Sequence, residues 1–199
     1  MEPRRQKIEK SVNALYTQRF QAGGKMMKRP DPINEEIELK NNVYIESDTD
    51  LKGIITYVND YFAEISRYSK GELVGQPHSI VRHPDMPKIL FKILWDRIQH
   101  GHNFIAAIKN LAKDGRYYWV FTDFDILKDE HGNLLGYKAS RKKISKHVTD
   151  ILDPLYKKLV EIEKESGMEA SEKYLTDFLK SHGDDITVDN MLEEIHRIY

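Results

Sequence analysis

The sequence predicts an α+β fold in which a small antiparallel sheet carries helices across one face. The first observation is the order of segments: an early β-rich run near residues 49–62, helical segments, then three β-rich runs between 104 and 141. The second is that alternate residues of those last runs can be assigned to one face of a strand. The third is the turn chemistry that separates them. Together these features predict a sheet and a helical layer with a pocket between the two.

Turn residues mark where the late strands end. Lys113-Asp114-Gly115 divides two β-rich runs as a tight hairpin turn would, and residues 130–133 do the same before the last run. Side chains alternate across a strand, so every second residue of each run shares one face. The residues assigned to the inward face are Phe104, Ala106, Ile108, Asn110, Tyr118, Val120, Thr122, Tyr137, Ala139 and Arg141.

One longer helix is predicted from Met86 to about Gln99. Asp85 stands where an N-cap is expected, and Pro87 falls in the first turn, where proline is tolerated. Arg82 and His83 precede this cap. An anionic diphosphate would be favoured there, because free amide groups and cationic side chains converge at a helix N-terminus.

Composition excludes several classes of protein. The 199 residues carry a net charge of −1, from 31 basic and 32 acidic residues. The overall charge therefore does not indicate binding to nucleic acid. Cysteine is absent, which removes disulfides and thiolate chemistry. We expect a cytoplasmic protein without direct membrane insertion, since no apolar run reaches the roughly 18 residues of a spanning helix. We also expect no enzymatic activity, because no phosphate loop or nucleophile motif is present.

Three regions are expected along the chain. Residues 1–36 comprise an amphipathic helix, with Ile8, Val12, Leu15 and Phe20 near helical spacing, and a proline-containing linker. Residues 37–146 form the sheet domain. Residues 147–199 form a helical extension, with helices predicted over 148–164, 168–181 and 188–199 and breaks at Gly167 and at the HGDD stretch.

Four segments resemble one known family. TDLKGIITYVND, SKGELVGQPHSIVRHPDMP, IKNLAKDGRYYWV and GYKASR resemble the PAS domain of bacterial aerotaxis receptors, which carry non-covalent FAD. Residues 90–95 and 104–120 are similar to stand-alone PAS proteins that sense for a separate membrane-bound chemotaxis transducer. The resemblance implies a PAS fold, with a five-stranded antiparallel sheet and a cofactor cleft between the sheet and its helices.

The resemblance also implies site residues, and each has a structural alternative. Arg82, His83 and Asp85 coincide with an Arg-His-Pro-Asp segment implicated in FAD binding; the alternatives are a surface ion pair, a solvated loop residue and a helix cap. Asn59 matches a family asparagine but suits a turn equally well. Trp95 matches a family tryptophan, although core packing on a helix stripe is the stronger interpretation.

Two inward polar residues raise the question of a ligand directly. An unpaired buried amide at Asn110 would cost roughly 1–3 kcal/mol, and the polar edge of an isoalloxazine ring would satisfy it. Arg141 needs an anion or an acceptor if it points inward; alternatively the strand ends there and the side chain reaches solvent. Phe104 stands where the aerotaxis receptors have tryptophan, and could still flank a flavin.

These features predict a PAS redox sensor that binds FAD and reports to a membrane-bound chemotaxis transducer. We expect it to be a homodimer whose terminal helices carry the output. Two alternatives stay open. His78 or His83 could ligate haem iron in a gas sensor. The pocket could instead be empty or filled by side chains, which would make the chain a cofactor-free interaction module.

Overall fold

The computed structural model describes residues 27–181, 187–188 and 190–191. The predicted N-terminal helix over residues 1–22 lies outside the described residues, as do the HGDD stretch and most of the predicted helix over 188–199. The described residues thus comprise the sheet domain, the linker that enters it and the first two helices that follow it.

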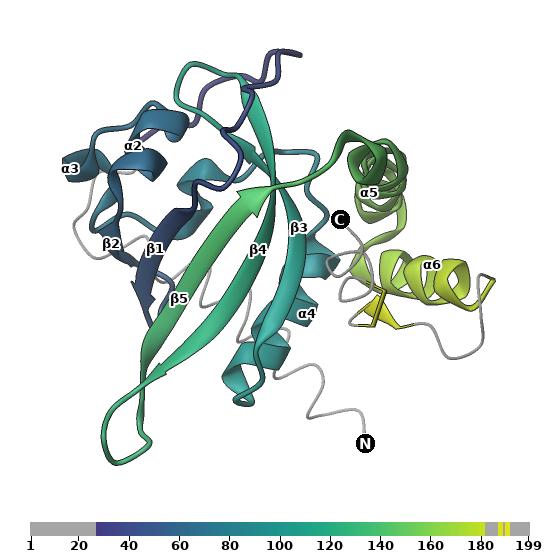
Figure 1. The fold of residues 1–199 in the computed structure, drawn as a ribbon. Helices are drawn as coiled ribbons and strands as arrows, with labels where there is room; N and C mark the ends of the chain where they lie inside the picture. Colours follow the sequence, from purple (N-terminus) through teal and green to yellow (C-terminus); the bar gives the residue numbers. More distant parts are fainter. Residues whose placement is uncertain (1–26, 182–186, 189, 192–199) are drawn as a thin grey trace.

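A five-stranded antiparallel sheet forms the centre of the molecule, as predicted (Figure 1). Its spatial order is β2-β1-β5-β4-β3, so the two early strands lie beside the last strand and the long hairpins complete the other half. The strands are β1 (Ile45–Asp50), β2 (Ile55–Val58), β3 (Phe104–Leu111), β4 (Tyr117–Lys128) and β5 (Leu134–Lys143).

The strand register confirms the predicted inward face. Four residues pair in sequence across neighbouring strands: Ala106 of β3, Thr122 of β4, Arg141 of β5 and Ile45 of β1. Residues directly opposite each other share a face, so a single row crosses the sheet from one edge strand toward the other. Both predicted turns are also present, with Gly115 adopting a φ of 89° and Gly132 a φ of 82°.

Helices cover the inward face and bury it. They are α2 (Asp60–Ser66), α3 (Lys70–Leu73), a 3₁₀ turn (His78–Val81) and α4 (Lys88–Gln99). Phe62, Leu73 and Ile89, one from each α-helix, are fully buried and belong to the same apolar core as the sheet. The helical layer thus holds side chains directly over the polar residues of the inward face.

The start of α4 differs from the prediction. The helix begins at Lys88, and Pro87 occupies the N-cap position without a side-chain hydrogen bond, so Asp85 is not the cap. Proline suits the position because it has no N–H to satisfy. The amide groups of Lys88 and Ile89 instead donate to the Glu163 carboxylate, each at 2.9 Å.

Two further helices pack beside the β3 edge of the sheet, where Figure 1 shows them stacked one on the other. They are α5 (Lys146–Ser166) and α6 (Met168–Lys180), with the predicted break at Gly167 between them. Tyr156 of α5 packs on Trp119 of β4, and its hydroxyl donates to the Ala107 carbonyl at 3.0 Å. Leu152, Leu159 and Leu175 join the core of the sheet domain, so the extension and the sheet share one core.

Candidate functional site

The central feature of the inward face is a buried arginine. Arg141 is 2% exposed, so the sequence-based alternative in which its side chain reaches solvent is wrong. Its guanidinium donates to the Ser47 hydroxyl at 3.0 Å and the Ala139 carbonyl at 3.2 Å, and its Nη2 lies 2.7 Å from His78 Nε2. The guanidinium carbon lies 5.3 Å from the centre of the Phe62 ring.

The partners of Arg141 are all neutral. Burial lowers the pKa of Arg141 to about 10, which leaves the side chain charged at neutral pH. Burial and the neighbouring guanidinium hold the pKa of His78 well below its usual value, so His78 is neutral and its Nε2 accepts the hydrogen bond from Arg141. Among the described residues, no carboxylate within ion-pair distance neutralises Arg141. A buried cation without a counter-ion is unfavourable unless a ligand supplies an acceptor.

Two unpartnered hydroxyls lie on the same face as the arginine. Thr122 lies opposite Arg141, and Tyr118, four residues before it on β4, also points inward. Both residues are fully buried, and neither the Thr122 Oγ1 nor the Tyr118 hydroxyl has a hydrogen-bond partner among the described residues. Buried polar groups are normally paired. These hydroxyls and the guanidinium therefore fit the polar edge of a heteroaromatic cofactor.

The remaining inward residues flank this polar group. Asn110 is buried and lies opposite Tyr118, which places it on the same face as predicted. Phe104 is buried at the far end of β3, opposite Phe124. Trp95 of α4 packs edge-on against Tyr137 at 5.6 Å between ring centres. This contact fits the core-packing interpretation of Trp95, and no described contact joins it to Arg141.

Asn59 caps a helix. Its side-chain oxygen accepts from the amide of Phe62 at 2.9 Å and from that of Glu46 at 3.2 Å, and its amide nitrogen donates to the Tyr44 carbonyl at 2.8 Å. These bonds join the start of α2 to the start of β1. Asn59 therefore positions Phe62, which lies over Arg141, and a direct bond to a ligand would have to replace one of these contacts.

The Arg-His-Pro-Asp segment runs along the free edge of β3. The backbone of Arg82 bridges Asn110, and the His83 amide donates to the Lys109 carbonyl at 3.3 Å. The Arg82 guanidinium lies over the Phe91 ring of α4, 3.4 Å from its centre. Burial and nearby Lys109 lower the pKa of His83 to about 4, and its Nδ1 accepts from the Asp85 amide.

Asp85 binds a lysine on the opposite face of the sheet from Arg141. Lys109 is 5% exposed, and its ammonium lies 2.8 Å from Asp85 and 3.1 Å from Asp153 of α5. Burial alone would raise the pKa of Asp153, but the bonds from Lys157 and Lys109 outweigh it and hold that pKa below its usual value. Lys109 therefore joins the Arg-His-Pro-Asp segment to α5.

Glu163 makes the second link between α5 and this region, because its carboxylate caps α4. Replacing Glu163 with alanine should lower the free energy of unfolding by about 0.5–2 kcal/mol, the usual effect of losing a cap near a helix dipole. Urea denaturation measures the change. Glu161→Ala is the matched control, since Glu161 makes an exposed ion pair with Lys158 on the same helix. An equal loss in both variants would contradict the capping role.

The structure thus divides the predicted site residues into two groups. Arg141 and Asn110 lie on the inward face, whereas the Asp85 carboxylate points to the Lys109 side of β3. Sequence reasoning missed Ser47 as a partner of Arg141, and considered His78 only as a haem ligand. It also missed Lys109, Asp153 and Glu163. Ser47 precedes the early β-rich run predicted near residues 49–62, and neither Ser47 nor the contacts of α5 carried a local signal in the sequence.

Comparison with known proteins agrees with this fold. The family described as "PAS fold" matches residues 55–140. Over 134 residues the chain is 36% identical to the aerotaxis receptor of Escherichia coli, a match that covers 67% of this chain and 26% of the receptor. It is 26% identical over 113 residues to the biofilm dispersion protein BdlA of Pseudomonas aeruginosa, covering 54% of this chain and 24% of that protein.

A solved structure shows a similar arrangement over part of the chain. The PAS domain of a protein from Colwellia psychrerythraea is 22% identical, with a TM-score of 0.48, and the match covers 52% of this chain and 87% of that one. The chain spans about a quarter, or less, of the curated relatives named above. Within the described residues, no helix has the length and apolarity to cross a membrane, and no cluster of three or more metal-ligating side chains occurs.

Proposed function

The chain carries a PAS domain of the aerotaxis receptor family, and on that basis we propose that it is a redox or energy-state sensor that binds FAD non-covalently. The similarity to the aerotaxis receptor supports a sensing role in taxis. The choice of a flavin rests on the inward polar group and on the family resemblance of the sequence. We further propose that the sensor is a cytoplasmic, non-enzymatic homodimer that signals to a membrane-bound chemotaxis transducer.

The observation that carries the proposal is the buried Arg141 with only neutral partners. Ser47, His78 and the Ala139 carbonyl satisfy part of its donor capacity. A guanidinium has five N–H donors, so it has capacity left for a ligand acceptor. The unpartnered hydroxyls of Tyr118 and Thr122 add two groups that can donate or accept. A flavin ring edge presents alternating donors and acceptors, which these side chains suit.

Each inward residue would have a definite role toward a bound flavin. FAD supplies reversible uptake of electrons and protons at its ring edge. Arg141 would bind an acceptor and stabilise negative charge there, since a buried cation interacts strongly across a low dielectric. Asn110 would contact the ring edge through an amide that can donate and accept. His78, held neutral, keeps the guanidinium in place by accepting through Nε2.

A change at the ring would reach the surface along β3. Asn110 is adjacent in sequence to Lys109, and its backbone bridges Arg82. Lys109 contacts Asp85 and Asp153, while Glu163 holds the start of α4. A shift of β3 or of the Arg-His-Pro-Asp segment would therefore alter contacts made by α5. Such coupling requires that oxidised and reduced cofactor favour different arrangements of these contacts.

A haem is the less favoured cofactor on the same residues. The Nε2 of His78 is already within hydrogen-bond distance of Arg141 and Ser47, and the Nδ1 of His83 accepts from the Asp85 amide. An iron bond to either of these nitrogens would have to break those contacts. A guanidinium beside His78 would also oppose the positive charge of a bound metal ion.

The sensing role is tested by reducing the flavin anaerobically and following the exposure of α5 to protease. We expect the cleavage rate within α5 to differ between oxidised and reduced protein, because Lys109 and Glu163 tie that helix to the site.

Asn110→Ala should shift the flavin reduction potential more than the flavin affinity. Identical cleavage in both redox states, together with an unchanged potential in the variant, would argue against a redox sensor.

A further inference from the structure

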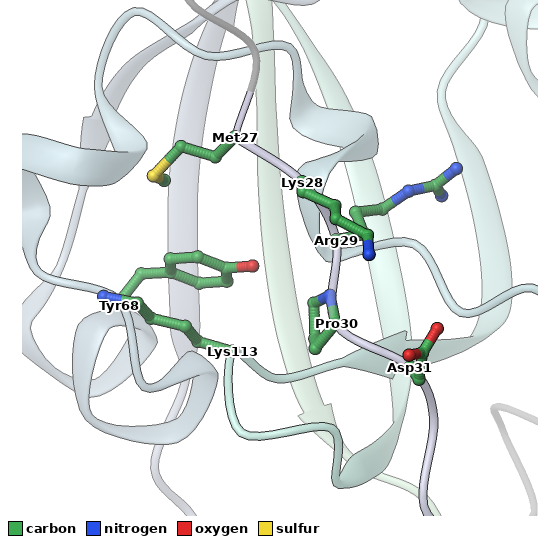
Figure 2. Close-up of a pocket in the computed structure, with 7 residues that line it drawn as sticks. All are labelled: Met27, Lys28, Arg29, Pro30, Asp31, Tyr68 and Lys113. Atoms are coloured by element: carbon green, nitrogen blue, oxygen red, sulfur yellow. The ribbon is translucent and has the colours of Figure 1, made fainter.

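A cavity opens where the N-terminal linker crosses the end of the sheet domain. Its volume is about 280 Å³, and Figure 2 shows the side chains that surround it. Five consecutive linker residues form one wall, and the domain supplies the other through Tyr68, which follows α2, and Lys113 of the β3–β4 turn. The linker residues in the wall are Met27, Lys28, Arg29, Pro30 and Asp31.

The lining of the cavity is basic. Lys28, Arg29 and Lys113 provide three cations, against the Asp31 carboxylate of the lining and the Glu72 carboxylate that pairs with Lys113. Lys28 and Arg29 are exposed, whereas the Lys113 ammonium is paired with Glu72. The Arg29 guanidinium donates to the Arg82 carbonyl at 3.2 Å, which fixes the linker against the Arg-His-Pro-Asp segment. Such a lining favours an anionic ligand.

A buried hydroxyl faces the same space. Tyr68 is 3% exposed, and its hydroxyl has no hydrogen-bond partner among the described residues. Figure 2 shows the Tyr68 ring between Met27 and Lys113, with its hydroxyl directed toward the linker. Burial raises the pKa of Tyr68, so the phenol remains protonated and can donate. A buried donor without a partner beside cationic side chains suits a phosphate oxygen.

The cavity is also adjacent to the inward polar group. Arg29 binds the carbonyl of Arg82, whose backbone bridges Asn110. The amide groups at the start of α4, where the sequence placed a diphosphate, already donate to Glu163. A diphosphate attached to a ring beside Asn110 therefore needs another site.

We propose that this cavity binds the adenosine diphosphate end of the dinucleotide, with Lys28, Arg29 and Tyr68 contacting its phosphates. The proposal rests on the proposed flavin function and extends it. The linker then completes the cofactor site, so that a dinucleotide holds the linker closed on the domain. A flavin without phosphates would make none of these contacts.

The test compares FAD with riboflavin, which lacks phosphates, on the flavin-free full-length chain. In Lys28→Gln/Arg29→Gln protein we expect FAD affinity to fall roughly tenfold or more, since a bond to a charged group carries about that effect. Riboflavin affinity should be unchanged. Tyr68→Phe should also lower the affinity for FAD, but by a smaller factor than the double variant. Lys173→Gln, an exposed helix cation distant in sequence from the cavity, is the matched control.

A titration with ADP alone keeps the outcome independent of the flavin. We expect ADP to shift the NMR signals of Lys28 and Arg29 in wild-type protein and to lose affinity in the double variant. Failure of every flavin to bind, with ADP binding intact, would refute the flavin function and leave the phosphate site standing. Two results together would overturn the site: the double variant binds FAD and riboflavin with the wild-type ratio of affinities, and ADP shifts no NMR signal of Lys28 or Arg29.

Discussion

Replacing Arg141 with methionine abolishes flavin retention while the protein stays folded. Truncating one partner of a buried charged contact weakens binding by about 2–5 kcal/mol, and here the ligand loses its only fully buried cation among the described residues. Stability should not fall in parallel. Methionine resembles arginine in length, and a buried charge with neutral partners is unfavourable in the protein without ligand. The flavin-free variant should therefore unfold at equal or higher urea concentration than flavin-free wild type.

The contrast between binding and stability separates a ligand-binding arginine from a structural one. Lys143→Met is the matched control, because Lys143 lies two residues further along β5 and makes an exposed pair with Glu38. It should keep full flavin content. Flavin released by heat from purified protein measures occupancy. A destabilised Arg141→Met protein that still binds flavin would show that the guanidinium serves the fold alone.

Lys109 is the second residue with a large expected effect. Lys109→Met leaves Asp85 and Asp153 without their shared cation, and should lower the free energy of unfolding by about 2–3 kcal/mol. That estimate lies below the roughly 3–5 kcal/mol of a fully buried pair, because both carboxylate side chains are partly exposed. Urea denaturation at neutral pH measures it. Lys92→Met, which breaks the more exposed pair with Glu172, is the control and should cost under about 1 kcal/mol.

The pH dependence of the Lys109 effect follows from the lowered pKa of Asp153. An aspartate with a depressed folded-state pKa contributes stability above its unfolded pKa of about 3.9, and that contribution is lost as the pH falls toward the folded value. The difference in the free energy of unfolding between Lys109→Met and wild type should therefore be complete at neutral pH and should shrink below about pH 4. A difference that grows on acidification would show that the lysine acts through packing instead.

Much of the sheet domain was predictable because its signals are local. Alternation placed Asn110, Thr122 and Arg141 on one face, and the register confirms it. Turn residues located both hairpins. Side chains alternate with a period of two along each strand, so one residue placed inward fixes the face of every other residue of that strand. The buried position of Arg141 follows from the same alternation, since β5 continues past it to Lys143.

The start of α4 was mispredicted because the true cap comes from far along the chain. Asp85 precedes a helix that contains Pro87 in its first predicted turn, and that pattern suits an N-cap. Glu163 provides the carboxylate instead, 74 and 75 residues away from the amides it accepts from. The Asp85 carboxylate does not cap the helix and instead pairs with Lys109. Nothing in a local window distinguishes these two arrangements.

The most direct test of the central claim is the visible absorption spectrum of freshly purified full-length protein, read together with the cofactor released by denaturation. We expect flavin bands, with one mole of FAD released per mole of protein chain. A haem Soret band, or colourless protein that takes up no added FAD, would contradict it.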